Sequence, residues 1–228
     1  MKKQEQEWEG LRRRVIEMGN LAEAMVGVAV EAITSSEVDS LIKKVLQQEE
    51  QLDKMQLAVD KEAIRLLTVY SPVAADLRFI MTVSRITGEL ERVGDHATNL
   101  CESIQLMTAK THVTPSENLQ KMGSLVSTMM HDALDAFARN DMLAARSTIA
   151  QDDMIDAIND QVLEELLSDQ LVREVLSGTK DIAGSLAQLL IARSLERIGD
   201  QATNISEEVV YMVKGDDIRH RTDESSNG

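Results

Sequence analysis

Apolar side chains recur at helical spacing along nearly the whole chain of 228 residues. Between residues 83 and 104 they follow the i+3/i+4 alternation of a buried helical stripe, and residues 191 to 209 repeat that alternation. The pattern predicts an all-α fold of six helices. We expect these helices at residues 8–34, 37–69, 72–109, 115–139, 141–168 and 179–214.

Turn and capping residues mark where the helices begin and end. Ser71 and Thr114, each followed by a proline, predict an N-cap with proline at the first helical position. Glu117, three residues after Thr114, completes the pattern of a capping box. The Ser-Gly pair at 177–178 predicts a further break, and Gly215 predicts the end of the last helix.

A nine-residue motif occurs twice, and its copies lie 105 residues apart. Residues 91–99 read ERVGDHATN and residues 196–204 read ERIGDQATN. An aspartate, Asp76 or Asp181, precedes each motif by fifteen residues. The duplication predicts two tandem, pseudo-symmetric three-helix bundles. The expected units are an N-terminal bundle at 1–110, a C-terminal bundle at 111–215 and a polar tail at 216–228.

Each motif places Glu, Asp and Asn four residues apart, so on a helix the three side chains form one stripe. At about 100° per residue, this stripe points nearly opposite to the apolar side of its own helix. We therefore expect it on a surface or an interface, outside the core of its own bundle. The stripes consist of Glu91, Asp95 and Asn99 in the first copy and of Glu196, Asp200 and Asn204 in the second.

Acid pairs at the same i, i+4 spacing occur on the preceding helices, Glu49 with Asp53 and Asp152 with Asp156. If each pair packs beside its motif helix, four carboxylates come together. Oxygen ligands suit hard cations and iron, which makes the stripes candidate metal sites. Asp53, Asp152 and Asp156 are weaker additions to these sites. The alternative is a solvated acidic face in an acidic protein.

Composition and charge narrow the class of protein. The net charge of -15 argues against a nucleic-acid binder and against adhesion to an anionic membrane. The single cysteine, Cys101, fits a reducing compartment. A run of about 18 apolar residues and the apolar core of a signal peptide are both absent from the sequence. We therefore expect a soluble, cytoplasmic protein.

The sequence contains no visible catalytic machinery. It has no Glu-x-x-His pattern of a di-iron site, no glycine-rich phosphate loop and no credible Ser/His/Asp set. It therefore favours a non-enzymatic protein. The alternatives are a metal store or metal-dependent enzyme that uses the duplicated stripes, and a purely structural helical adaptor.

The doubled motif resembles that of the PhoU family, as do Asp76-Leu77-Arg78 ahead of the first copy and the segment 215–220. The resemblance extends over essentially the whole chain. It implies two similar three-helix bundles in a protein that is commonly a homodimer. It also implies a cytoplasmic regulator that restrains phosphate uptake and represses the phosphate regulon when phosphate is plentiful.

The resemblance further implies partners and metals. The expected partners are the ATPase subunit of the phosphate ABC transporter and the phosphate sensor histidine kinase. Membrane association is then expected only through these partners, and nucleic acid is not an expected ligand. Some members of the family carry metal clusters on these acid motifs. Surface-bound iron, zinc, magnesium or manganese ions on the stripe residues are therefore implied as cofactors.

Overall fold

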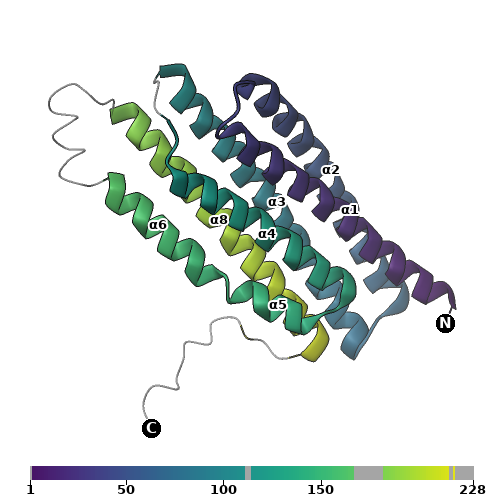
Figure 1. The fold of residues 1–228 in the computed structure, drawn as a ribbon. Coiled ribbons are helices and arrows are strands. Elements are labelled where there is room, and N and C mark those ends of the chain that lie inside the picture. Colours follow the sequence, from purple (N-terminus) through teal and green to yellow (C-terminus); the bar gives the residue numbers. More distant parts are fainter. Residues whose placement is uncertain (1, 111–113, 167–181, 216–217, 219–228) are drawn as a thin grey trace, which may run out of the picture.

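The structure is a computed structural model, and it describes residues 2–110, 114–166, 182–215 and 218. Every regular element in these ranges is an α-helix (Figure 1), which confirms the predicted all-α fold. The helices are α1 (Lys2–Ala32), α2 (Val38–Tyr70), α3 (Ala74–Lys110), α4 (Glu117–Arg139), α5 (Met142–Ile149), α6 (Asp152–Leu166) and α8 (Ile182–Lys214).

The helices form two bundles, as the duplication predicts. Helices α1, α2 and α3 pack against one another, and α8 packs against α4, α5 and α6. The bundles lie side by side because α3 packs along α8 and α1 packs along α4 (Figure 1). Their buried apolar residues form one contiguous cluster. The expected boundary between the bundles lies beside residues 111–113, which are outside the described residues.

The single helix expected at 141–168 is wrong, because α5 ends at Ile149 and α6 begins at Asp152. Ala150 caps α5, donating its N–H to the carbonyl of Arg146. Asp152 and Asp153 then stand in the first turn of α6, where acidic side chains favour a helix N-terminus. The break therefore occurs where the local sequence favours a new helix start over continuation.

The two predicted N-caps are also wrong. Ser71 has a φ of 44° and donates its N–H to the carbonyl of Leu67, so it caps the end of α2. The N-cap of α4 is Ser116, whose hydroxyl oxygen accepts from the N–H of Asn118 at 3.2 Å. Ser116 displaces Thr114 because α6 and α8 hold it, through Glu165 and Gln188.

The end of the last helix is predicted correctly. Gly215 has a φ of 78° and donates its N–H to the carbonyl of Tyr211 at 2.8 Å. Glycine adopts this left-handed conformation without the strain that a Cβ would bring. The break expected at 177–178 and most of the tail at 216–228 lie outside the described residues.

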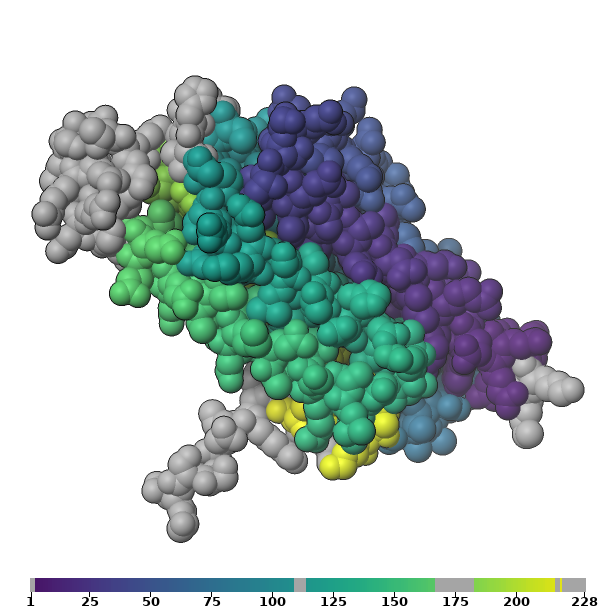
Figure 2. Space-filling view, in the orientation of Figure 1, coloured from purple at the N-terminus to yellow at the C-terminus, as the bar shows by residue number. Residues whose placement is uncertain are grey.

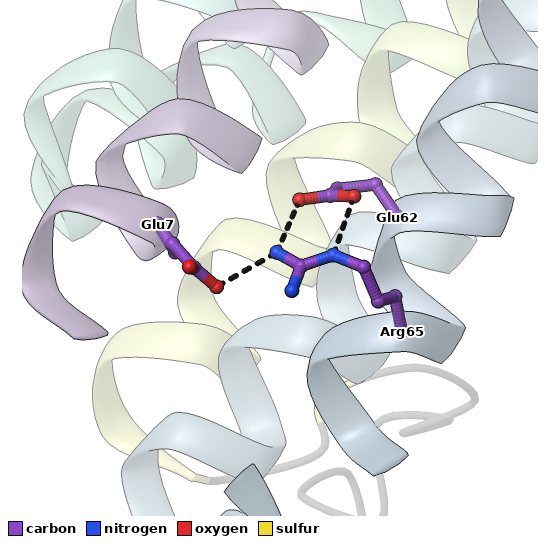
Figure 3. A network of polar contacts seen from close by, with 3 residues as sticks. All are labelled: Glu7, Glu62 and Arg65. Atoms are coloured by element: carbon purple, nitrogen blue, oxygen red, sulfur yellow. Dashed lines mark hydrogen bonds and ion pairs between the residues drawn. The ribbon is translucent and has the colours of Figure 1, made fainter. Parts of the chain in front are cut away.

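Aliphatic side chains and methionine fill the core, since aromatic residues make up only 2% of the chain. Polar contacts join the start of α1 to the end of α2. Arg65 on α2 donates to Glu7 on α1 at 2.7 Å and to Glu62 on its own helix (Figure 3). The Trp8 ring contacts the Tyr70 ring edge to face beside this network.

Among the described helices, none combines the length and the apolar character that a membrane crossing requires.

Helices α1 and α4 contact each other through a pair of matching glycines. A Cβ on Gly19 would lie 2.5 Å from Cδ2 of Leu134, and a Cβ on Gly123 would lie 2.8 Å from Cγ1 of Val30. In both pairs, Gly19 with Gly123 and Val30 with Leu134, the second residue follows the first by 104 positions. The two contacts are therefore related by pseudo-two-fold symmetry. Figure 2 shows α1 and α4 together on one face of the molecule.

We expect Gly123→Ala to lower the free energy of unfolding by about 1 kcal/mol, because overpacking outweighs the gain in helix propensity. Val30 is β-branched and has little rotamer freedom with which to relieve the contact. Urea denaturation followed by circular dichroism measures the change. Gly27→Ala is the matched control, since Gly27 is exposed and nothing lies within 4 Å of its Cβ position. We expect it to stabilise by about 0.5–1 kcal/mol. Equal gains in both variants would contradict the close contact.

Candidate functional site

The two predicted stripes lie on α3 and α8, the last helix of each bundle. Asp95 and Asn99 are exposed, and the other four stripe residues are half-buried. On the opposite side of each helix the apolar residues are buried, among them Val93 and Ile198. These exposures agree with the outward direction that helical spacing predicts.

The glycine at the centre of each motif brings the preceding helix close. A Cβ on Gly94 would lie 2.5 Å from Cδ2 of Leu52 on α2, so only glycine allows this approach without a shift. In the second copy a Cβ on Gly199 would touch Ile155 on α6 at 3.5 Å. Because Leu52 precedes Asp53, and Ile155 precedes Asp156, this packing brings the acid pairs beside the motif helices.

The first acid cluster joins α2 to α3. It consists of Glu49, Asp53, Glu91 and Asp95, which influence one another electrostatically. Burial raises the pKa of Glu91, and the charges of Asp95 and Asp53 raise it further, against the opposing effect of Arg92. Burial likewise raises the pKa of Glu49, with Asp53 and Asp95 adding to it.

The second cluster joins α6 to α8 in the same way. Burial raises the pKa of Asp200 to about 6, with Asp152, Glu196 and Asp156 adding to the rise and Arg197 opposing it. Burial also raises the pKa of Asp152, although Thr203 Oγ1 donates to Asp152 Oδ1 at 3.1 Å. Both repeats therefore gather four carboxylates in which proximity and burial disfavour the charged form.

The carboxylates of the predicted sites thus come together, with Asp53 in the first cluster and Asp152 and Asp156 in the second. Carboxylate oxygens of this kind fit a hard cation. Among the described residues, however, no group of three or more His, Cys, Asp or Glu side chains is arranged so that it could hold a metal ion. Metal binding would require these side chains to rotate toward one another.

The asparagines of the stripes take a different direction from the carboxylates. Asn204 Nδ2 donates to Glu89 Oε2 on α3 at 3.3 Å. Asn99 lines a cleft between α3 and α8. Each stripe therefore divides, with its two carboxylates beside the preceding helix and its amide at the contact between the bundles.

The contact between α3 and α8 includes a buried ion pair, which sequence reasoning missed. Arg85 Nη1 lies 3.3 Å from both carboxylate oxygens of Glu208, which is only 3% exposed. The guanidinium of Arg85 also lies 5.3 Å from the ring centre of Tyr211. Glu208 stands on the buried side of an otherwise ordinary helical pattern, and one buried acid was the only signal available in the sequence.

The fold and these clusters define a class of protein made from two copies of one three-helix module, each with an acidic motif on its last helix. The PhoU domain matches the chain twice, at residues 15–104 and 119–209. The chain belongs to the PhoU family, which confirms the resemblance seen in the sequence.

Relatives with established names cover nearly the whole chain. The Phosphate-specific transport system accessory protein PhoU of Escherichia coli (strain K12) is 33% identical over 214 residues, or 94% of this chain and 86% of the relative. The corresponding PhoU homolog of Pseudomonas putida is 37% identical over 215 residues, or 94% of this chain and 82% of the relative.

Two solved structures share the fold. The crystal structure of PhoU from Pseudomonas aeruginosa matches with a TM-score of 0.82 and 34% identity, covering 93% of this chain and 99% of that one. The phosphate transport system regulatory protein PhoU from Streptococcus pneumoniae matches with a TM-score of 0.84 and 24% identity, covering 94% and 99%. The second match bears on the fold alone.

We expect Asp200→Asn to raise the melting temperature by roughly 2 °C at pH 7.5, measured with chelator present. The raised pKa means that folding discourages the charged form, so this group's contribution to stability falls as pH rises from about 4 to about 6. The gain at pH 7.5 is modest because solvent screens a side chain that is 35% exposed. The gain should shrink toward pH 4. Glu164→Gln, an exposed acid on α6, is the control. An equal rise in the melting temperature of Glu164→Gln would show that the effect comes from the change in net charge alone.

Proposed function

We propose that this protein is a cytoplasmic, non-enzymatic regulator of phosphate uptake and phosphate-starvation signalling. The observation that carries the proposal is the match of both repeats to the PhoU domain, over most of the chain. The named relatives are accessory proteins of phosphate-specific transport systems, and they extend over 94% of this chain. In this role the protein represses the phosphate regulon when phosphate is plentiful.

Regulation then proceeds through protein contacts. The ATPase subunit of the phosphate ABC transporter and the sensor histidine kinase are the proposed partners, and a second copy of the chain completes a homodimer. The pseudo-symmetric pair of bundles supports this proposal because it supplies two related surfaces, one for each partner. The high negative charge favours partners that present basic surfaces, which accelerate association.

Metal binding is proposed as an accessory feature of the two acid clusters. The carboxylates of Glu91 and Asp95, with Asp53, would hold a cation in the first repeat, and Glu196 and Asp200, with Asp152 and Asp156, would hold one in the second. Iron, zinc, magnesium and manganese all accept oxygen ligands. A bound cation supplies positive charge that relieves the repulsion among these carboxylates. Asn99 and Asn204 lie at the contact between the bundles and would contribute less.

Deletion of this chain tests the regulatory role. We expect phosphate-replete cells without it to express phosphate-starvation genes, because the kinase would lose the contact that restrains it. Transcript levels in high and low phosphate measure the effect, and expression of the intact chain from a plasmid should restore repression. Unchanged transcripts in the deletion strain would refute the proposal.

The double variant Glu91→Ala/Glu196→Ala tests the metal sites. We expect the purified protein, equilibrated with each of the four metals, to carry metal by elemental analysis, and the double variant to lose most of it. Loss of one carboxylate per cluster removes an oxygen ligand and a negative charge, and so lowers the affinity for a cation.

Glu9→Ala/Glu164→Ala removes two exposed acids outside the clusters and serves as the matched control. Metal retention in the control but not in the double variant supports the clusters as the sites. If neither protein carries metal, the metal role is wrong. Repression that survives in the double variant would separate metal binding from regulation.

A further inference from the structure

A cleft of about 420 Å³ opens between α3 and α8 at one end of their contact. It carries two arginines, Arg193 and Arg197 on α8, together with His96 and Asn99 on α3. Glu102 is the single carboxylate among the residues that line it. In a chain with a net charge of -15, this cleft is locally cationic.

Charged pairs occupy the pseudo-symmetric position at the other end of the same contact. There Arg85 pairs with Glu208, and Arg92 donates to Glu89 at 3.1 Å. Asn204 donates to Glu89 as well. At that end the arginines therefore have carboxylate partners from within the chain.

The sequence differs between the two ends at the positions that matter. The two motif copies lie 105 residues apart, and at this offset Ser103 is equivalent to Glu208 and Ser194 is equivalent to Glu89. Two carboxylates are thus replaced by two serines. The same offset places Arg193 where the first repeat has Gly88. It also places Leu190 where the first repeat has Arg85, so each end carries two arginines. The cleft therefore differs from its counterpart by the absence of two carboxylates at these positions.

The donors in the cleft are available to a ligand. Arg193 is exposed and pairs with none of the described carboxylates, whereas Arg197 makes one long contact, 3.4 Å from its Nη1 to Asp200 Oδ2. The hydroxyls of Ser103 and Ser194 donate to carbonyls of their own helices. Burial lowers the pKa of His96, and Arg197 and Arg92 lower it further against the opposing charge of Asp95.

We propose that this cleft binds a phosphoryl group, with Arg193 and Arg197 as its main ligands. A guanidinium presents a planar fork of donors that matches two oxygens of a phosphoryl group. The second repeat has lost the internal carboxylates that satisfy the equivalent arginine in the first, so a ligand oxyanion takes their place. The volume lies within the usual range of about 300–1,000 Å³ for small-molecule sites, so free phosphate and a small phosphate monoester both fit.

Isothermal titration of the full chain with inorganic phosphate, and separately with glycerol 3-phosphate, tests the site at constant ionic strength with chloride as the reference anion. We expect saturable binding of at least one of the two ligands, and the two arms distinguish free phosphate from an esterified phosphoryl group. We expect Arg193→Ala to weaken binding roughly ten- to hundred-fold, as loss of a charge-assisted hydrogen-bonding group does.

Two further variants make the result specific. Ser194→Glu restores the carboxylate that the first repeat has at this position, and we expect it to abolish binding while both arginines remain. Arg13→Ala, at an exposed position on α1, should leave binding unchanged. Circular dichroism confirms that each variant is folded. No saturable binding of either ligand, or equal weakening by Arg13→Ala, would overturn the proposal. The test reads binding in vitro, so it stands whether or not the proposed regulatory role is correct.

Discussion

The contact between α3 and α8 is the feature on which the rest of the structure depends, because it joins the two bundles. A buried ion pair lies toward one end of this contact, with Glu208 almost fully buried against Arg85 and the ring of Tyr211. Removing a carboxylate from water costs several kcal/mol, and a close cation roughly offsets that cost. The ion pair of Arg85 with Glu208 therefore contributes mainly by fixing the register of α8 against α3. A slip of α8 by one turn along α3 would separate these charges, whereas apolar side chains tolerate such a slip.

The two repeats have kept their apolar contacts and diverged in their polar ones. The glycine contacts of Gly19 with Leu134 and of Gly123 with Val30 are equivalent on both sides of the pseudo-two-fold relation. The acid clusters are also present twice. At the polar contact between the bundles the equivalence ends, since Glu208 corresponds to Ser103. The duplicated packing fixes the architecture, and the asymmetric polar positions are free to acquire separate functions.

Helical spacing predicted the fold because each bundle buries a continuous stripe, and the doubled motif predicted its duplication. The acid pairs at i, i+4 on the preceding helices allowed the acid clusters to be predicted as well. The packing of Leu52 and Ile155 on the motif glycines is what brings those pairs beside the motif helices. The break at 150–151 was missed because residues 141–168 keep a helical pattern across it. The true N-cap at Ser116 depends on Gln188 and Glu165 from distant helices. Long-range polar pairs of this kind leave no periodic signal in one sequence.

Arg197 belongs to both of the sites proposed for this molecule. Arg197 lines the cleft, and its Nη1 lies 3.4 Å from Asp200 Oδ2 in the second acid cluster. A cation bound among the carboxylates would offset the charge that holds Arg197 near Asp200, and would leave the arginine freer to contact an anion. An anion bound in the cleft would in turn draw Arg197 from Asp200 and leave that carboxylate freer to bind a cation. If both proposed sites bind their ligands, binding would be coupled reciprocally, each ligand changing the affinity for the other by the same factor. Such coupling would need only the Arg197 side chain to move, while the helices that hold both sites stay in place.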